Sequence, residues 1–194
     1  MNVMHFLLLI YSVFTVNIVL QCALGIKGVV ESKSSIGIAT YIKAGIIFFV
    51  IILLWFLFSK IILSLASGIF IYIILFPVST IVYDVFEYLI FSLLVKKDVK
   101  SENIINFPGG ITAVAVFICI NVTNSILDTI VLSFGFVSGI FLVNSIIREI
   151  RRRAALEAVP VFLRGKPLVL VSMGLLSLVF TTASLLLFRM ISAG

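Results

Sequence analysis

Residues 108–147 read PGGITAVAVFICINVTNSILDTIVLSFGFVSGIFLVNSII and contain a single charged side chain, Asp128. A transmembrane helix needs about 20 mostly apolar residues, so this stretch is long enough for two. We expect the two helices to meet in a tight turn near Asp128, with Gly135 as a second candidate for the break.

The rest of the chain repeats this pattern. Six apolar runs contain only three charged side chains, and these are Lys43, Asp84 and Glu87. Lipid-facing backbone must satisfy its own hydrogen bonds, so the runs predict an all-α membrane protein with six transmembrane helices. We expect one integral membrane domain over residues 1–194, with halves at about 1–95 and 96–194. The runs are 4–26, 36–58, 66–93, 108–127, 129–147 and 168–188.

Composition excludes most soluble classes of protein. Apolar residues make up 62% of the chain, far more than a soluble domain of this length carries. The net charge is +6, but the basic residues flank the apolar runs, so we expect membrane lipid and no nucleic acid as a partner. Cys22 and Cys119 both lie in apolar runs, where a free cysteine usually packs as a small apolar residue.

Basic residues also predict the orientation. The connections after the first, third and fifth runs carry two, three and six of them, whereas the opposite side carries only Lys60 and Arg189. The positive-inside rule then places these eleven residues in the cytoplasm and both termini outside. We expect a multi-pass protein of a bacterial or archaeal plasma membrane. The eleven are Lys27, Lys33, Lys96, Lys97, Lys100, Arg148, Arg151, Arg152, Arg153, Arg164 and Lys166.

Polar side chains interrupt the first and fourth runs. Asn17 and Gln21 lie in the first, and Asn121, Asn124 and their neighbours lie in the fourth. Such groups either bond to other helices or line a cavity where the helix is broken. Because these runs open the two halves of the chain, the second interpretation predicts an inverted repeat of three plus three helices with a central site.

Ionisable side chains inside spans suggest function by default. Asp84 and Glu87 are three residues apart and share a helix face, and Lys43 lies in the preceding run. Together with Asn121 and Asn124 they are candidates for an ion pathway. The alternatives are a structural ion pair and side chains that extend to the membrane interface.

The connection from 148 to 167 continues the fifth helix with five charges in six residues, Arg148, Glu149, Arg151, Arg152 and Arg153. Glu149 is spaced to pair with Arg152 or Arg153 on one helix face. The basic cluster predicts an anchor at lipid headgroups or a docking surface for an acidic partner.

Several segments resemble the paired six-helix subunits of Rnf and Na⁺-translocating NADH:quinone reductase (Nqr) complexes, above all the RnfA/NqrE branch. The 17–26 stretch is similar to that family's asparagine-to-Leu-Gly-Leu segment, 122–125 to its Thr-Thr-Asn-Cys, and 84–87 to a Gln-x-x-Glu. The C-terminal part carries the most specific resemblance, to Ile-Arg-Glu, Val-Pro, Arg-Gly and Gly-Leu-Met-Ser-Leu-x-Phe in that order. The matching residues there are 147–149, 159–160, 164–165 and 174–180.

This resemblance implies an inverted repeat and a homologous membrane partner of opposite topology within an electron-transfer complex of further subunits. In that family one cysteine in each of helices 1 and 4 binds a membrane-embedded [2Fe–2S] cluster. Those positions are Lys27 and Ser125 here, and neither supplies the thiolate that such clusters prefer. Cys22 and Cys119, five and six residues earlier, are the substitutes. We therefore predict no cofactor in this chain.

The sequence thus favours an integral membrane subunit of an ion-translocating electron-transport complex that lacks the usual cluster ligands. It would be at most a subunit of an oxidoreductase, with no catalytic residues of its own. A small-solute or ion transporter and a non-redox assembly subunit on the same fold are the alternatives.

Orientation can be tested with reporter fusions. A fusion at Gly194 should be active only with a reporter that works outside the membrane, and one near Glu157 only with a cytoplasmic reporter, because basic connections are retained inside. A cytoplasmic signal at Gly194 would contradict the six-span topology or its orientation.

Overall fold

The computed structural model describes residues 3–21, 38–59, 70–94, 110–156 and 160–192, and all regular secondary structure in these ranges is helical. The predicted all-α fold is therefore confirmed for this part of the chain. The elements in chain order are α1 (Val3–Ile10), the π-helical turn η1 (Tyr11–Thr15), α2 (Ile18–Gln21), α4 (Ile38–Leu57), α6 (Phe70–Leu94), α7 (Gly110–Val122), α8 (Ile126–Leu156), the 3-10 turn η4 (Val161–Leu163) and α9 (Lys166–Ser192).

Within the described ranges, three helices are long and apolar enough to cross a membrane. They are α6, α8 and α9, with apolar windows at Ile73–Ile90, Ile126–Ala154 and Lys166–Leu186. The other runs give shorter apolar helical stretches, His5–Leu20, Tyr41–Leu57 and Gly110–Val122. The described part of each predicted run is thus mainly helical, and the count of six spans stays a prediction.

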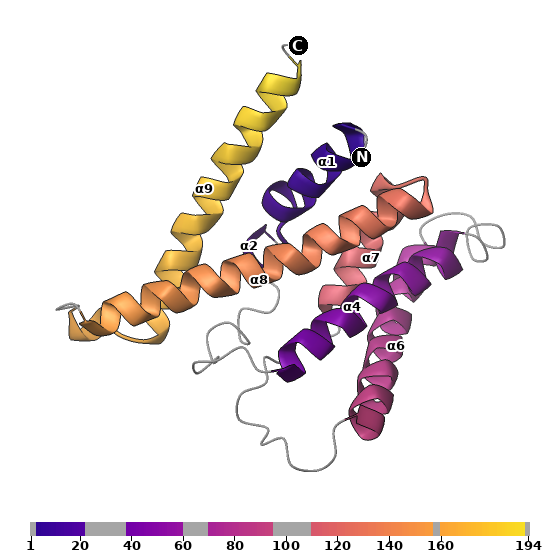
Figure 1. Cartoon of the computed structure of the whole chain (residues 1–194), viewed down its shortest axis with the longest axis horizontal. Coiled ribbons are helices and arrows are strands. Elements are labelled where there is room, and N and C mark those ends of the chain that lie inside the picture. Colours follow the sequence, from indigo (N-terminus) through magenta and orange to yellow (C-terminus); the bar gives the residue numbers. More distant parts are fainter. Residues whose placement is uncertain (1–2, 22–37, 60–69, 95–109, 157–159, 193–194) are drawn as a thin grey trace.

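Helix α8 lies at the centre of the arrangement. Figure 1 shows it crossing the molecule, with α1 and α9 on one side and α4, α6 and α7 on the other. Half of its apolar window is buried (50%), compared with 17% for α6 and 22% for α9. Its fully buried side chains recur at helical spacing, at Leu132, Phe136, Val143 and Ile147, so one continuous face of α8 is packed against its neighbours.

Two glycines let the first segment approach α8 closely. A Cβ on Gly139 would lie 3.0 Å from Asn17 Nδ2 and 3.3 Å from the carbonyl oxygen of Val13. A Cβ on Gly135 would lie 2.7 Å from Ser12 Cβ and would also overlap the Ser12 hydroxyl oxygen. Small residues four apart commonly bring membrane helices together in this way. The expected break at Gly135 is wrong, because α8 runs through that residue and uses it for packing.

The turn between α7 and α8 lies near Asp128, as predicted, but does not include that residue. It lies at residues 123–125, and Asp128 belongs to the first turn of α8. A carboxylate is stabilised near a helix N-terminus by the helix dipole. Asp128 Oδ1 also lies 3.1 Å from His5 Nδ1 of α1. Asp128 therefore begins the helix and joins it to α1 instead of forming the turn.

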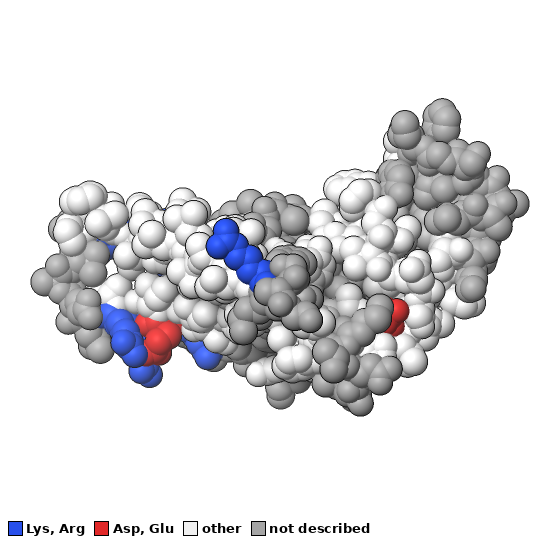
Figure 2. All heavy atoms as spheres, turned by 90° about the horizontal axis from the view of Figure 1, so that it is seen from above, with Lys and Arg blue, Asp and Glu red and all other residues white. Residues whose placement is uncertain are grey.

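At its other end α8 extends beyond the apolar run to Leu156, as the basic sequence predicted. Glu149 Oε1 accepts hydrogen bonds from Arg152 Nη2 at 3.0 Å and Arg153 Nε at 3.1 Å. In Figure 2, Lys and Arg atoms surround acidic atoms at one end of an otherwise mostly uncharged surface. Gly165 turns the chain with φ +84°, a backbone conformation that suits glycine, and Pro167 lies in the first turn of α9.

The glycine contacts can be tested by adding one methyl group. Gly135→Ala should lower the free energy of unfolding by about 1–3 kcal/mol, the usual effect of overpacking, because the new Cβ overlaps Ser12. The change would be measured by thermal unfolding in a mild detergent.

Gly174→Ala is the matched control, since nothing lies within 4 Å of a Cβ at that residue, and it should leave stability unchanged or slightly raised. Ser12→Gly in the Gly135→Ala chain removes both overlapping atoms and should recover part of the loss. Equal stability of Gly135→Ala and Gly174→Ala would contradict the close approach.

Candidate functional site

An ion pair between a buried lysine and a half-buried glutamate joins α4 to α6. Lys43 Nζ lies 2.6 Å from Glu87 Oε1, and the side chains are 4% and 26% exposed. The structure therefore pairs two of the three charged residues singled out in the apolar runs. This favours the structural ion pair among the sequence interpretations of Lys43. The same two helices also meet through aromatic side chains, with Phe49 and Phe86 at 5.6 Å between ring centroids.

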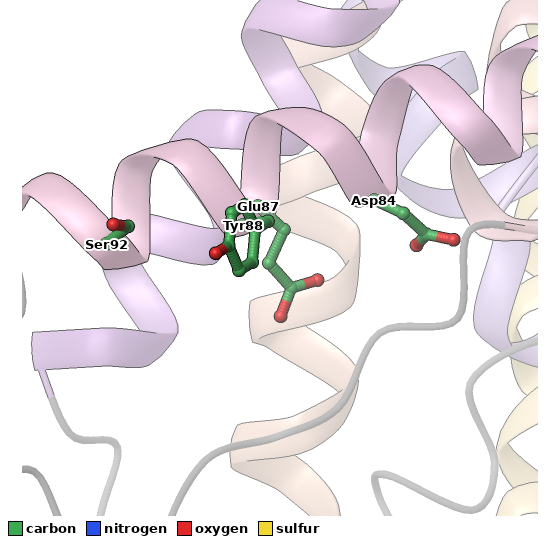
Figure 3. Close-up of a pocket in the computed structure, with 4 residues that line it drawn as sticks. All are labelled: Asp84, Glu87, Tyr88 and Ser92. Carbon is green, nitrogen blue, oxygen red and sulfur yellow. The ribbon is translucent and has the colours of Figure 1, made fainter.

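Beside this pair α6 carries an open groove of about 550 Å³, lined by Asp84, Glu87, Tyr88 and Ser92. Figure 3 shows the four side chains along one side of the helix, with both carboxylates directed away from its axis. The predicted shared face of Asp84 and Glu87 is confirmed. Tyr88 and Ser92 were not singled out from the sequence, although Tyr88 lies four residues after Asp84 and Ser92 four residues after Tyr88, a spacing that could have identified them.

The groove has a definite chemical character. One carboxylate, Glu87, is held by an ammonium group, and the second, Asp84, is exposed on a helix whose window is only 17% buried. The hydroxyl side chains of Tyr88 and Ser92 line the same groove. Such a surface can attract a cation or exchange protons, and in hydrocarbon a charged group of this kind needs water or a protein partner.

Asn17 fills the break in the first helical segment. The helix is interrupted at residues 16–17, where Asn17 is only 1% exposed. Its amide nitrogen donates to the carbonyl oxygens of Val13 at 3.0 Å and Gly139 at 3.3 Å. Its Oδ1 accepts from the Leu20 backbone N–H at 3.3 Å, so Asn17 caps α2. These hydrogen bonds are all made to other groups of the chain, in agreement with the interpretation that polar residues in the apolar runs bond between helices.

The polar residues near the end of α7 are split between the interior and the surface. Thr123 is buried, donates to the Cys119 carbonyl oxygen at 2.7 Å, and lies 2.7 Å from the Thr129 hydroxyl across the turn. Asn121 and Asn124 are both exposed, and the Asn121 amide donates to the Phe117 carbonyl oxygen at 2.7 Å. These two asparagines thus lie on an outer face of the turn and not in an internal cavity.

The described residues do not fit the [2Fe–2S] cluster that the family resemblance implies. Cys119 is completely buried within the chain at 0% exposure, so its thiol does not reach a surface that a partner could share. Ser125, at the family's ligand position, is exposed but offers a hydroxyl instead of a thiolate. Cys22 and Lys27 lie outside the described residues.

No protein-family model matches this chain, and no curated protein matches it. The assignment of function therefore depends on the residues themselves.

The ion pair can be tested by removing one charge and then both. Glu87→Leu should lower the free energy of unfolding by about 3 kcal/mol, because the Lys43 ammonium group loses its carboxylate in a buried position. The double variant Lys43→Met with Glu87→Leu should recover most of this loss, since well-packed apolar residues often replace a buried pair without penalty. Unfolding would be followed by helical circular dichroism during titration with a denaturing detergent.

Asp84→Asn, on the same helix but exposed, is the control and should change stability little. A Glu87→Leu chain as stable as the unmodified one would show that the pair does not hold α4 against α6.

Proposed function

We propose that this chain is a six-span integral membrane protein with both termini outside and the basic end of α8 in the cytoplasm. Three membrane-length helices and three shorter apolar stretches support the spans. The grouping of eleven basic residues on alternate connections supports the orientation. Of these eleven, the five at Lys27, Lys33, Lys96, Lys97 and Lys100 lie outside the described residues.

We further propose that it serves as a membrane subunit of an Rnf/Nqr-type ion-translocating electron-transport complex and supplies no cluster ligands of its own. The observation that carries this proposal is the interruption that follows the first helical segment of each half. The eight residues of α1 and five of η1 precede the first interruption, and the 13 residues of α7 precede the second. The second of these breaks is the α7–α8 turn, so what the two halves share is a short first helical segment that ends at polar residues. A correspondence of this kind between halves is typical of inverted repeats, and the motif resemblance points the same way.

A homologous membrane subunit of opposite topology is the partner that this architecture favours. Asp84 is exposed on an otherwise apolar helix, and Asn124 is exposed in the turn between α7 and α8. Polar groups facing lipid are costly, whereas a second membrane protein can satisfy them. A role in scaffolding or in gating ion movement beside redox subunits follows from such a position.

A second candidate is a small-solute or ion transporter on the same fold. The Lys43–Glu87 pair beside the exposed Asp84 favours it, because ionisable groups on membrane helices mark ion and proton pathways. A non-redox assembly subunit would instead use the pair only to hold α4 against α6. The identity of the companion proteins separates these candidates.

Purification of the tagged chain from its native host in a mild detergent should recover a homologous membrane subunit together with flavin-carrying and ferredoxin-like proteins. Mass spectrometry would identify them, and an unrelated tagged multi-pass protein from the same membranes is the control. Recovery of the chain alone, as a stable monodisperse monomer, would contradict the proposal and favour the transporter.

The same preparation tests whether this chain supplies ligands to a [2Fe–2S] cluster. Electron paramagnetic resonance of the complex should be unchanged by Cys22→Ser and Cys119→Ser, because neither thiol is expected to bind iron. Loss of a [2Fe–2S] signal from an otherwise intact complex would instead identify these cysteines as ligands.

A further inference from the structure

A basic pocket lies between the C-terminal end of α8 and the start of α9. Its described lining consists of Arg151 and Ala154 from α8, with Arg164, Gly165 and Leu168 from the turn and the start of α9. The volume is about 450 Å³, within the range of small-molecule sites. Two guanidinium groups from segments separated in sequence therefore border one cavity.

The position of this pocket relates it to the membrane surface. The apolar run on α8 ends at Ile147, one turn before Arg151, and the apolar window of α9 begins at Lys166. The pocket therefore lies at the common end of the apolar parts of two membrane-length helices. Residues 148–167 carry six basic and two acidic side chains. An anionic group at this depth meets a positive field from the protein.

The arginines of this region divide into two groups. Arg152 and Arg153 both bond to Glu149, at 3.0 and 3.1 Å, and neither lines the pocket. Arg151 lines it together with Arg164. Guanidinium groups match phosphate oxygens in geometry and charge, so the pocket offers phosphate recognition that the Glu149 cluster does not.

An apolar surface continues from the pocket along α9. Leu168 lines the pocket itself, and one turn further Val171 is 52% exposed, followed by Leu175 at 60%. Phe162, in the turn before Arg164, is 77% exposed. A molecule with a phosphate headgroup and an acyl chain matches both the basic pocket and the apolar surface beside it, whereas a free phosphate would contact the pocket alone.

We propose that this pocket binds the headgroup of an anionic phospholipid, with its phosphate held by Arg151 and Arg164 and an acyl chain lying along the exposed face of α9. The inference rests on membrane insertion of α8 and α9, which is part of the proposed function, and is independent of the electron-transport complex.

The test is native mass spectrometry of the full chain released from nanodiscs of phosphatidylcholine with 20–30% phosphatidylglycerol (about the anionic fraction of a charged leaflet). The unmodified chain should retain phosphatidylglycerol in preference to phosphatidylcholine. Arg151→Gln and Arg164→Gln should each lower that preference about fivefold. The matched control is Arg152→Gln with Arg153→Gln, which removes the same charge as the two pocket changes together and should have less effect than either single one.

Thermal unfolding of the unmodified chain in detergent separates the two sources of phosphate. Added phosphatidylglycerol should raise the unfolding temperature and inorganic phosphate should not. Equal shifts from both would overturn the lipid assignment, and so would equal loss of lipid preference in pocket and control variants. Arg164→Lys keeps the charge, so it should retain part of the preference if Arg164→Gln fails to fold.

Three further outcomes would each overturn a different part of the inference. Retention of phosphatidylcholine without any anionic preference would overturn this inference and leave membrane insertion intact. Recovery of the chain in the soluble fraction, without bound lipid of either kind, would overturn insertion itself. Loss of a companion protein, with lipid binding unchanged, from the pocket variants would replace the lipid with an acidic protein partner.

Discussion

The close approach of the first helical segment to α8 is the contact on which the rest of the arrangement depends. A helix interrupted in a region without water must find partners for its free backbone groups inside the protein. Asn17 meets this need by capping α2 and by donating to the Gly139 carbonyl oxygen. It reaches that oxygen because Gly135 and Gly139 have no side chains in the way. Once this segment occupies one side of α8, the opposite side is left for α4 and α7, which explains why α8 is the most buried of the three membrane-length helices.

The Lys43–Glu87 pair has a different role from that of the apolar core. Helix α6 buries little of its surface, so hydrophobic packing alone gives it a weak preference for one position among apolar neighbours, because lipid is as apolar as the protein. An ion pair of 2.6 Å between α4 and α6 is satisfied at one register only. It therefore fixes α6 relative to α4, and this in turn sets where the exposed Asp84 side chain lies.

Hydropathy was sufficient to predict the helices, because long apolar runs have few stable alternatives in a membrane. The positions of helix breaks, turns and ion pairs were harder to predict, because the same residue type is compatible with more than one of these roles. Gly135 could end a helix or allow close packing, and only its contact with Ser12 in three dimensions selects packing. Asp128 looked like a turn residue, whereas the Thr-Asn-Ser sequence at 123–125 forms the turn and Asp128 suits the helix start. Lys43 and Glu87 were each identified from the sequence, but their pairing required the packing of α4 against α6. For Cys22 and Lys27 the sequence prediction stands untested, since both lie outside the described residues.

Some polar side chains on the apolar helices are buried and hydrogen-bonded, whereas others are exposed, and this difference bears on function. Ser12, Asn17 and Thr123 are buried and bonded internally, so the fold is able to satisfy polar groups where they serve packing alone. Asp84 and Ser92 are instead left exposed in a groove on an apolar helix. Packing does not account for a carboxylate in that position, and lipid is a costly environment for it. A groove completed by another membrane protein, or hydrated as part of an ion path, removes that cost, and both arrangements are expected of a subunit that works beside others.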